Sequence, residues 1–366
     1  MDCLYTKILS VVGARPNYIK LAAVYNVFNK LFTHIIVDTG QHYDYEMNRV
    51  FFDQLAIPEP HYFLGVGSGS HGYQVGEMIK RVEEVLLRER PDLVVVYGDT
   101  NSTLAGALAA VKAGFRVAHV EAGLRSFDMS MPEEVNRRVV DHVSHFLFAP
   151  TLSALRNLQA ERVYGKIFLT GDVHVAVLQR WLPIAEERSK ILERLGLESR
   201  KYAVLTLHRA ENVDNINRLK KLLDLAKRVA EHMPVVFPIH PRTRKRIKEA
   251  GLDNALLTNN LIVTDPLGYI DFIKLLAHSE LVLTDSGGVQ REAYLLKRPL
   301  VILRRTTEWV ELVEHKVALL YEIEEGGANV KSVIEWRPQT YVEGLLGDEK
   351  APEKIADIIV KELSSS

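Results

Sequence analysis

The residues best suited to binding an anionic ligand are Asp-Ser-Gly-Gly at 285–288, between the apolar run 281–283 and a helix-like stretch at 289–296. Two consecutive glycines let the backbone turn sharply and approach a ligand closely. The following helix would direct unpaired N–H groups and its positive dipole end towards a diphosphate. One turn further on, Glu292 can accept hydrogen bonds from a sugar hydroxyl. The pattern indicates a nucleotide-sugar site, with a plain strand-to-helix turn as the alternative.

Two carboxylates follow neighbouring predicted strands. Asp99 comes after the apolar run 93–97, and Glu121 comes directly after 117–120. Carboxylates at adjacent strand ends can face one pocket, where desolvation and mutual repulsion raise one pKa towards the range useful for proton transfer. The sequence therefore predicts an acid/base pair, and helix capping is the competing interpretation for Asp99.

Cationic and histidine side chains follow or close other predicted strands. Arg15 and Lys20 follow the first apolar run and suit an anionic oxygen. In the second half of the chain, His208 and His240 each close a strand, and a histidine titrates near neutral pH. Glu133 begins a helix-like stretch, where acidic residues are favoured for structural reasons as well.

Alternating apolar runs and amphipathic stretches must position these side chains. In the first half we expect strands at 8–12, 35–38, 93–97, 117–120 and 146–149, with helices at 18–30, 74–90, 102–113 and 133–143. In the second half we expect strands at 203–207, 235–239, 261–264, 281–284 and 300–303.

This rhythm predicts an α/β chain with two doubly wound, Rossmann-like domains facing each other across a cleft. We expect the first domain at 1–172, joined by a C-terminal helix at 352–366, and the second at 173–351. Because open parallel sheets bind ligands at the carboxyl ends of their strands, the polar motifs would line that cleft.

Composition excludes several classes of partner. The 366 residues carry 46 basic and 47 acidic side chains and a net charge of -1, so nothing in the balance calls for nucleic acid or an anionic membrane. Since no apolar stretch approaches the ~20 residues of a membrane span and the start lacks a signal-peptide core, we expect a cytoplasmic protein. The single cysteine, Cys3, has no partner for an intramolecular disulfide.

Neither a nicotinamide cofactor nor a metal is predicted. Residues 67–72 fit the pattern Gly-x-Gly-x-x-Gly, but they follow a weak strand at 61–64 and lack the acid that should end the next strand. His142 and His145 share a helical face, but no third ligand clusters with them.

In its ordered motifs the chain resembles the non-hydrolysing UDP-N-acetylglucosamine 2-epimerases, a family similar to the glycosyltransferase-B fold. The resemblance runs over nearly the whole chain, through Gly-Ala-Arg-Pro at 13–16, Thr-Gly-Gln-His at 39–42, Gly-Asp-Thr at 98–100, His-Val-Glu-Ala-Gly-Leu-Arg at 119–125, Pro-Glu-Glu-Val-Asn-Arg at 132–137, Thr-Leu-His-Arg at 206–209 and Thr-Asp-Ser-Gly-Gly at 284–288. It implies catalytic roles for Asp99, Glu121, Glu133 and His208. It also implies that the UDP-sugar is bound by Asp99, Glu121, His208, Arg15, Lys20, Leu267, Phe272, Ser286, Gly287, Gly288 and Glu292, with Leu267 and Phe272 near uracil.

The resemblance further implies a reaction that needs no cofactor. A carboxylate removes the C2 proton while the C1–O bond breaks, which gives UDP and a 2-acetamidoglucal. UDP then adds back as a proton reaches C2 from the other face, and the product is UDP-N-acetylmannosamine. Which carboxylate removes the proton and which returns it stays open. A homodimer is expected on the same grounds.

The sequence departs from the family pattern at two places. Trp309 stands where many members have a substrate-contacting arginine, a variant that resembles relatives acting on UDP-2,3-diacetamido-2,3-dideoxyglucuronate. Members of the family have a second, regulatory substrate site, and Gln41, His42, Gln74, Arg209 and His240 resemble parts of it. Tyr73 stands where an arginine of that site would be expected.

Two other classes of function compete with an epimerase. A glycosyltransferase would use the same two-domain fold but needs an acceptor, and the sequence offers no apolar patch for docking one. A nucleotide-sugar sensor would keep the segment 286–288 and Glu292 but would not need Asp99, Glu121 and Glu133 together.

Overall fold

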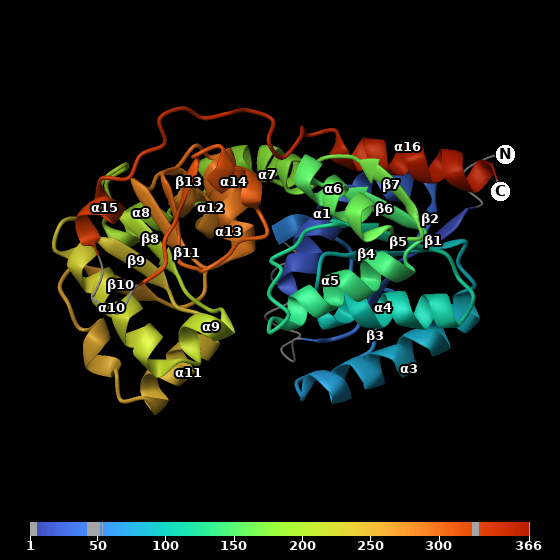
Figure 1. Ribbon diagram of the computed structural model, residues 1–366, viewed down its shortest axis with the longest axis horizontal. Coiled ribbons are helices and arrows are strands. Elements are labelled where there is room, and N and C mark those ends of the chain that lie inside the picture. The colour runs from blue at the N-terminus through green and yellow to red at the C-terminus, as the bar shows by residue number, and fades with distance from the viewer. Residues whose placement is uncertain (1–5, 42–51, 53, 324–328, 366) are drawn as a thin grey trace. The chain divides into compact units, whose positions relative to one another are not determined.

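The computed structural model describes residues 6–41, 52, 54–323 and 329–365. The chain divides into two compact units, the first holding residues up to Gln179 together with those from Leu346 onward, and the second holding Arg180–Leu345. Each unit is built around its own parallel sheet with helices between the strands (Figure 1). The prediction of an α/β fold with two Rossmann-like sheets is confirmed.

The sheet of the first unit has seven strands in the described residues, all parallel, in the order β3-β2-β1-β4-β5-β6-β7. The strands are β1 (Lys7–Val12), β2 (Thr33–Asp38), β3 (Tyr62–Phe63), β4 (Leu93–Tyr97), β5 (Val117–Val120), β6 (Phe146–Ala149) and β7 (Lys166–Leu169). Every residue of β4 and β5 is buried, as expected for strands covered on both faces. The strand order reverses between β1 and β4, and open α/β sheets bind ligands at such a switch point.

Helices cover both faces of this sheet. They are α1 (Arg15–Leu31), α3 (His71–Glu89), α4 (Asn101–Lys112), α5 (Pro132–Val143), α6 (Leu152–Glu161), α7 (His174–Arg188), which continues into the second unit, and α16 (Ala351–Ser364). The helices α3, α4 and α5 lie side by side on one face, while α1 packs against α16 on the other (Figure 1). In the described part of the chain, no helix combines the length and apolar character needed to cross a bilayer.

The second unit repeats this plan with a six-stranded parallel sheet, counted in its described residues, in the order β10-β9-β8-β11-β12-β13. Its strands are β8 (Ala203–Thr206), β9 (Val235–Pro238), β10 (Leu261–Thr264), β11 (Leu281–Thr284), β12 (Leu300–Ile302) and β13 (Ala318–Leu320). Its helices are α8 (Ile191–Leu195), α9 (Ala210–Val213), α10 (Ile216–Ala230), α11 (Pro241–Glu249), α12 (Tyr269–Ala277), α13 (Gly287–Leu295), α14 (Val310–Glu314) and α15 (Val330–Ile334), with a 3-10 helix at Asp253–Leu256. The strand order reverses between β8 and β11, so the loops after these two strands meet.

Two strands were not expected from the sequence, and both are edge strands. In β7 the residues are half-buried or exposed, and β13 is only three residues long. Edge strands pair on one side only and need no long apolar run, so their sequence signal is weak. Half of the expected strands have the observed bounds, and the other half differ from them by one or two residues at one end.

Candidate active site

Asp99 follows β4 and is held by the first two turns of α5. Its carboxylate lies 2.5 Å from Nη2 of Arg137, and the side-chain amide of Asn136 donates to its backbone carbonyl at 2.9 Å. The residue that caps α4 is Thr100, whose hydroxyl accepts the Thr103 N–H at 3.3 Å. The capping alternative therefore applies to Thr100, and the Asp99 carboxylate is engaged in an ion pair instead.

Glu121 directly follows β5 and pairs with a lysine from α1. The distance from its Oε1 to Nζ of Lys20 is 3.0 Å, and both side chains are buried. Gly98 makes room for this pair, since a Cβ at Gly98 would lie 2.5 Å from the Lys20 Nζ and 3.4 Å from Oε1 of Glu121. The switch point of the first sheet thus holds a buried ion pair formed by residues from two of the expected motifs.

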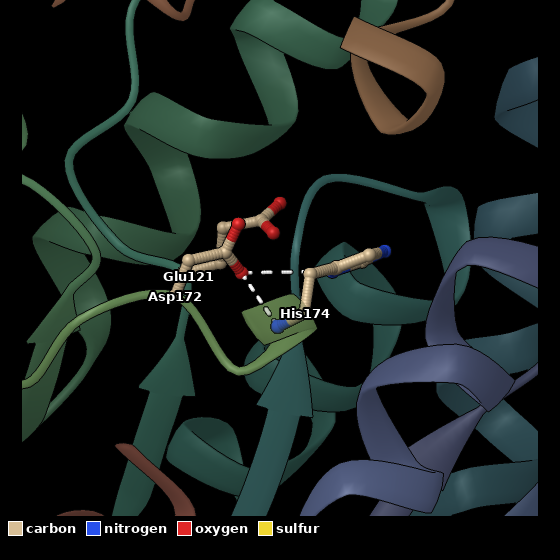
Figure 2. A group of neighbouring side chains, drawn as sticks. All are labelled: Glu121, Asp172 and His174. Atoms are coloured by element: carbon tan, nitrogen blue, oxygen red, sulfur yellow. Dashed lines mark hydrogen bonds and ion pairs between the residues drawn. The ribbon is translucent and has the colours of Figure 1, made fainter. Parts of the chain in front are cut away.

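Two further side chains lie beside Glu121 (Figure 2). Asp172 follows β7, and its Oδ1 accepts the backbone N–H of His174 at 3.0 Å and lies 3.5 Å from the His174 Nδ1. The potential ligand atoms of Glu121, Asp172 and His174 all lie within 4.8 Å of one another. A divalent ion bound here would have to share Glu121 with the ammonium of Lys20. Neither residue could be found from the sequence, because β7, which positions Asp172, has no buried apolar run.

Asn17 connects the loops after β1 and β4. Its amide donates to the carbonyl of Tyr97 at 2.8 Å, while its Oδ1 accepts from the Ala14 N–H at 3.2 Å and from the Thr100 hydroxyl at 3.0 Å. Arg15 begins the same helix and is half-buried. Asn17 was also missed, although a polar residue in the first turn of a helix behind a strand is a signal of such bridging.

The two glutamates that begin α5 have different surroundings. Glu134 is fully buried, and its carboxylate accepts the Ser126 N–H at 2.8 Å and pairs with Arg137 at 3.3 Å. Glu133 is half-buried in the same turn. Glu134 therefore anchors the loop before α5, whereas Glu133 is the one of the two that stays a candidate for proton transfer.

In the second unit, Asp285 organises the loop that carries His208. The Asp285 carboxylate is fully buried and accepts the backbone N–H groups of His208 at 3.0 Å and of Arg209 at 3.0 Å, as well as the Asn212 amide at 3.0 Å. The Nδ1 of His208 lies 3.3 Å from Oδ1 of Asp285, and its ring lies 5.5 Å from that of the exposed His240. Asp285 thus holds His208 and its loop in place.

The glycine turn after β11 lies against a buried charge network. A Cβ on Gly287 would be 2.2 Å from Oε1 of Glu308 and 3.4 Å from Nε1 of Trp309. Glu308 pairs with the fully buried Arg304 at 2.7 Å, and the guanidinium of Arg291 lies over the Trp309 ring at 4.5 Å. Trp309, where the family resemblance led us to expect an arginine, is therefore a buried residue that supports the turn.

The remaining expected ligands of the second unit lie on neighbouring elements. Ser286 precedes α13 and, among the described residues, makes no side-chain capping hydrogen bond, while Gly288 is half-buried in the first turn. The buried Glu292 lies one turn further along α13. Leu267 is half-buried in the loop after β10, and Phe272 is buried in α12, which packs against α13.

The residues expected at a regulatory site belong to both units. Gln41 accepts from the Ser102 hydroxyl at 2.7 Å, and the Oε1 of Gln74 accepts the Asn101 amide at 2.7 Å. Arg209 and His240 belong to the second unit, and His42 lies outside the described residues, as does Cys3.

We expect Gly287→Ala to destabilise the second unit and Gly288→Ala to be tolerated. The Cβ added at Gly287 meets Glu308, which the buried Arg304 holds in place, so the expected cost is about 1–3 kcal/mol of unfolding free energy. At Gly288 the nearest atom to an added Cβ is Ser286 Oγ at 3.8 Å, an ordinary contact. Urea unfolding of both variants checks this, and equal stabilities would contradict it.

We also expect ionisation of Asp38, the last residue of β2, to lower the free energy of unfolding as the pH rises. Burial raises its pKa from 3.8 to about 6, against the opposing hydrogen bonds from Gly40 and Tyr18. Because the folded carboxyl binds its proton more tightly than the unfolded one, stability present below about pH 4 is lost as the pH rises through about 6, by roughly 3 kcal/mol. Unfolding of wild type and Asp38→Asn at pH 4 and pH 7 measures this, and a difference between the two that does not change with pH would refute it.

The sequence of this chain is similar to those of one protein family. Residues 28–360 match the family model described as UDP-N-acetylglucosamine 2-epimerase. A UDP-N-acetylglucosamine 2-epimerase homolog of Methanococcus maripaludis is 50% identical over 84% of this chain and 86% of its own length. The UDP-2,3-diacetamido-2,3-dideoxy-D-glucuronate 2-epimerase of Pseudomonas aeruginosa is 47% identical, also over 84% of this chain and 86% of its own length.

A solved structure agrees with these relatives. The crystal structure of the UDP-GlcNAc 2-epimerase of Methanocaldococcus jannaschii, in complex with UDP-GlcNAc and UDP, superimposes with a TM-score of 0.90 at 42% identity. The match covers 97% of this chain and 100% of that one. With its fold, its ordered motifs and its sequence in agreement, the chain belongs to the UDP-N-acetylglucosamine 2-epimerase family.

Proposed function

We propose that this protein is an isomerase that interconverts UDP-N-acetylglucosamine and UDP-N-acetylmannosamine. The observation that carries the proposal is the pairing of two carboxylates with two cations at the ends of adjacent strands. Asp99 lies 2.5 Å from Arg137, and Glu121 lies 3.0 Å from Lys20. A sensor that only binds a nucleotide sugar would not need these carboxylates together at the ends of adjacent strands.

In the proposed reaction the groups of the first unit move protons. One carboxylate among Asp99, Glu121 and Glu133 removes the C2 proton as the C1–O bond breaks, so that UDP leaves with the bonding electron pair and a 2-acetamidoglucal remains. A second group of the set delivers a proton to the opposite face of C2 as UDP adds back to C1. After one forward reaction the base carries a proton and the acid has lost one. Proton exchange with water then returns both groups to their starting states.

In the second unit, α13 and the loop after β8 would stabilise the departing diphosphate. The N–H groups that follow Ser286 lie at the positive end of α13, and His208 and Arg209 follow the neighbouring strand. Leu267 and Phe272 are proposed to contact the uracil. No step of this reaction calls for a metal ion or a redox cofactor.

Two observations support a second substrate. Trp309 stands where many members of the family have a substrate-contacting arginine, and a relative of nearly the same similarity acts on the diacetamido glucuronate. The same elimination and re-addition would serve either nucleotide sugar, because both carry an acetamido group at C2. We keep UDP-N-acetylglucosamine as the first candidate.

Proton NMR in deuterated water tests the proposal. The protein is incubated with UDP-N-acetylglucosamine, and new anomeric signals and the C2 proton are followed. New signals of UDP-N-acetylmannosamine with deuterium at C2 would support both the reaction and the proton exchange. If this sugar nucleotide stays unchanged and the diacetamido uronate is epimerised, the second substrate is correct. If neither reacts, the proposed function is wrong.

We further propose that the protein is a homodimer, as the family resemblance implies. Light scattering coupled to size exclusion measures the mass in solution. A mass near the 41.4 kDa of one chain at micromolar concentration would contradict this part of the proposal.

A further inference from the structure

His119 is a fully buried histidine in β5, two residues before Glu121. Its Nε2 lies 2.7 Å from the carbonyl oxygen of Gly98, and its Nδ1 lies 2.7 Å from Oδ1 of Asp141. A carbonyl oxygen only accepts hydrogen bonds, so Nε2 carries a hydrogen. Whether Nδ1 also carries one depends on the charge of Asp141.

Asp141 is held as an anion inside α5. Its Oδ2 accepts the Gly123 N–H at 3.0 Å and lies 2.7 Å from Nη1 of Arg125. Burial by itself raises the pKa of Asp141, but the charges and hydrogen bonds of His119 and Arg125 hold it below its usual range. Nδ1 of His119 therefore faces a carboxylate, just as Nε2 faces a carbonyl oxygen. A ring that carries a hydrogen on both nitrogens donates to both of these acceptors.

The pair of His119 and Asp141 contacts both turns that carry the proposed catalytic carboxylates. The Gly98 carbonyl belongs to the peptide group that leads into Asp99, and the Gly123 N–H follows Glu121 by two residues. Both glycines have positive φ, at 65° and 85°, so neither turn is an extended continuation of its strand. The Gly98 turn accepts a hydrogen bond from His119, and the Gly123 turn donates one to the Asp141 carboxylate. Hydrogen bonds that involve an ionised group are about twice as strong as neutral ones.

We propose that His119, kept charged by Asp141, is a positioning residue that fixes Asp99 relative to Glu121. This rests on the proposed function, because it assigns proton transfer at C2 to these carboxylates. His119 acts through the Gly98 carbonyl and, by way of Asp141, through the Gly123 amide. A displacement of about 1 Å in a reacting group can cost about 10²-fold in rate, so the fixed distance between the two turns matters for turnover.

A second buried histidine in the same sheet is the matched control. His34 lies in β2, and its Nε2 lies 2.8 Å from the Ser10 hydroxyl. Burial, with a smaller contribution from His61, lowers the pKa of His34 to about 3, so it is neutral at physiological pH. His34 and His119 are thus both buried in strands of the same sheet. They differ in their proposed charge, and only His119 contacts the two turns.

Histidine NMR tests the charge independently of any substrate. In ¹⁵N-labelled protein at pH 8, long-range ¹H–¹⁵N spectra should report both ring nitrogens of His119 protonated and one ring nitrogen of His34 protonated. In Asp141→Asn, the amide can still accept from Gly123 and Arg125, and His119 should become neutral with one protonated nitrogen. A singly protonated His119 in the wild type would overturn the assignment.

Kinetics test the positioning role on protein that is shown by circular dichroism and UDP binding to be folded. We expect His119→Ala to lower kcat about 10²-fold with KM within about threefold, and His34→Ala to leave kcat within about twofold. Asp141→Asn should fall between wild type and His119→Ala, and it replaces that variant if His119→Ala does not fold. The positioning role would be refuted if His34→Ala lost as much kcat as His119→Ala. It would also be refuted if kcat were unchanged in both His119→Ala and Asp141→Asn. If wild type turns over neither nucleotide sugar, the proposed function fails while the NMR result on His119 still stands.

Discussion

Asp99→Asn should reduce turnover of the nucleotide sugar by about 10²–10⁴-fold, the usual contribution of a positioned general acid or base. Asparagine keeps the size of the side chain but has no carboxylate to take up or return the C2 proton. UDP binding should stay within a few-fold of wild type, because the residues proposed to bind the diphosphate belong to the second unit. The rate of epimerisation and the Kd for UDP are the two measurements.

The fold should survive this substitution. Arg137 keeps its ion pair with Glu134 at 3.3 Å, and Asn136 donates to the backbone carbonyl at position 99, which does not change. Asp92→Asn is the matched control, since Asp92 lies at the opposite end of the same strand and its carboxylate accepts the Lys7 N–H at 2.8 Å. If Asp99→Asn and Asp92→Asn turn over equally fast, Asp99 has no part in the reaction.

Lys20→Met is expected to lower the free energy of unfolding by about 3–5 kcal/mol and to abolish turnover. Methionine matches the lysine stem in length but leaves the Glu121 carboxylate buried without the Lys20 charge, and breaking a buried pair from one side is costly. Exposed pairs contribute much less. Lys166→Met, which removes a 2.5 Å pair with Glu362 on the surface of the same unit, should cost about 1 kcal/mol or less.

A double-mutant cycle separates the ion pair from other effects of the substitution. Removing both charges in Lys20→Met/Glu121→Gln should restore part of the stability, because neither charge then stays buried without the other. Turnover should not return, since Glu121 is proposed to take part in proton transfer. If the double variant is as unstable as the sum of the two single variants, Lys20 and Glu121 are not energetically coupled. Chemical denaturation of all four proteins provides the cycle.

The strands at the centre of both sheets were predictable from short apolar runs, because parallel strands are buried on both faces. The runs at 93–97 and 117–120 correspond to β4 and β5 without a shift. The edge strands β7 and β13 were not predictable in this way, since burial on fewer sides leaves no continuous apolar run. Missing β7 also hid Asp172 and His174.

The sequence by itself determined which motifs end the strands and which family they belong to, because strand ends and glycine turns are local features of the chain. It could not assign the partner of each charged side chain. Lys20 meets Glu121 only because the strand order places the ends of β1, β4 and β5 side by side. Asp99 meets Arg137 because α5 packs beside α4, the helix that follows Asp99. The hydrogen-bond partners of His119 were decided in the same way, because Asp141 on α5 and Gly98 after β4 are distant from it in sequence. Charge and hydrogen bonding depend on distance in space, and for these residues the tertiary structure alone sets that distance.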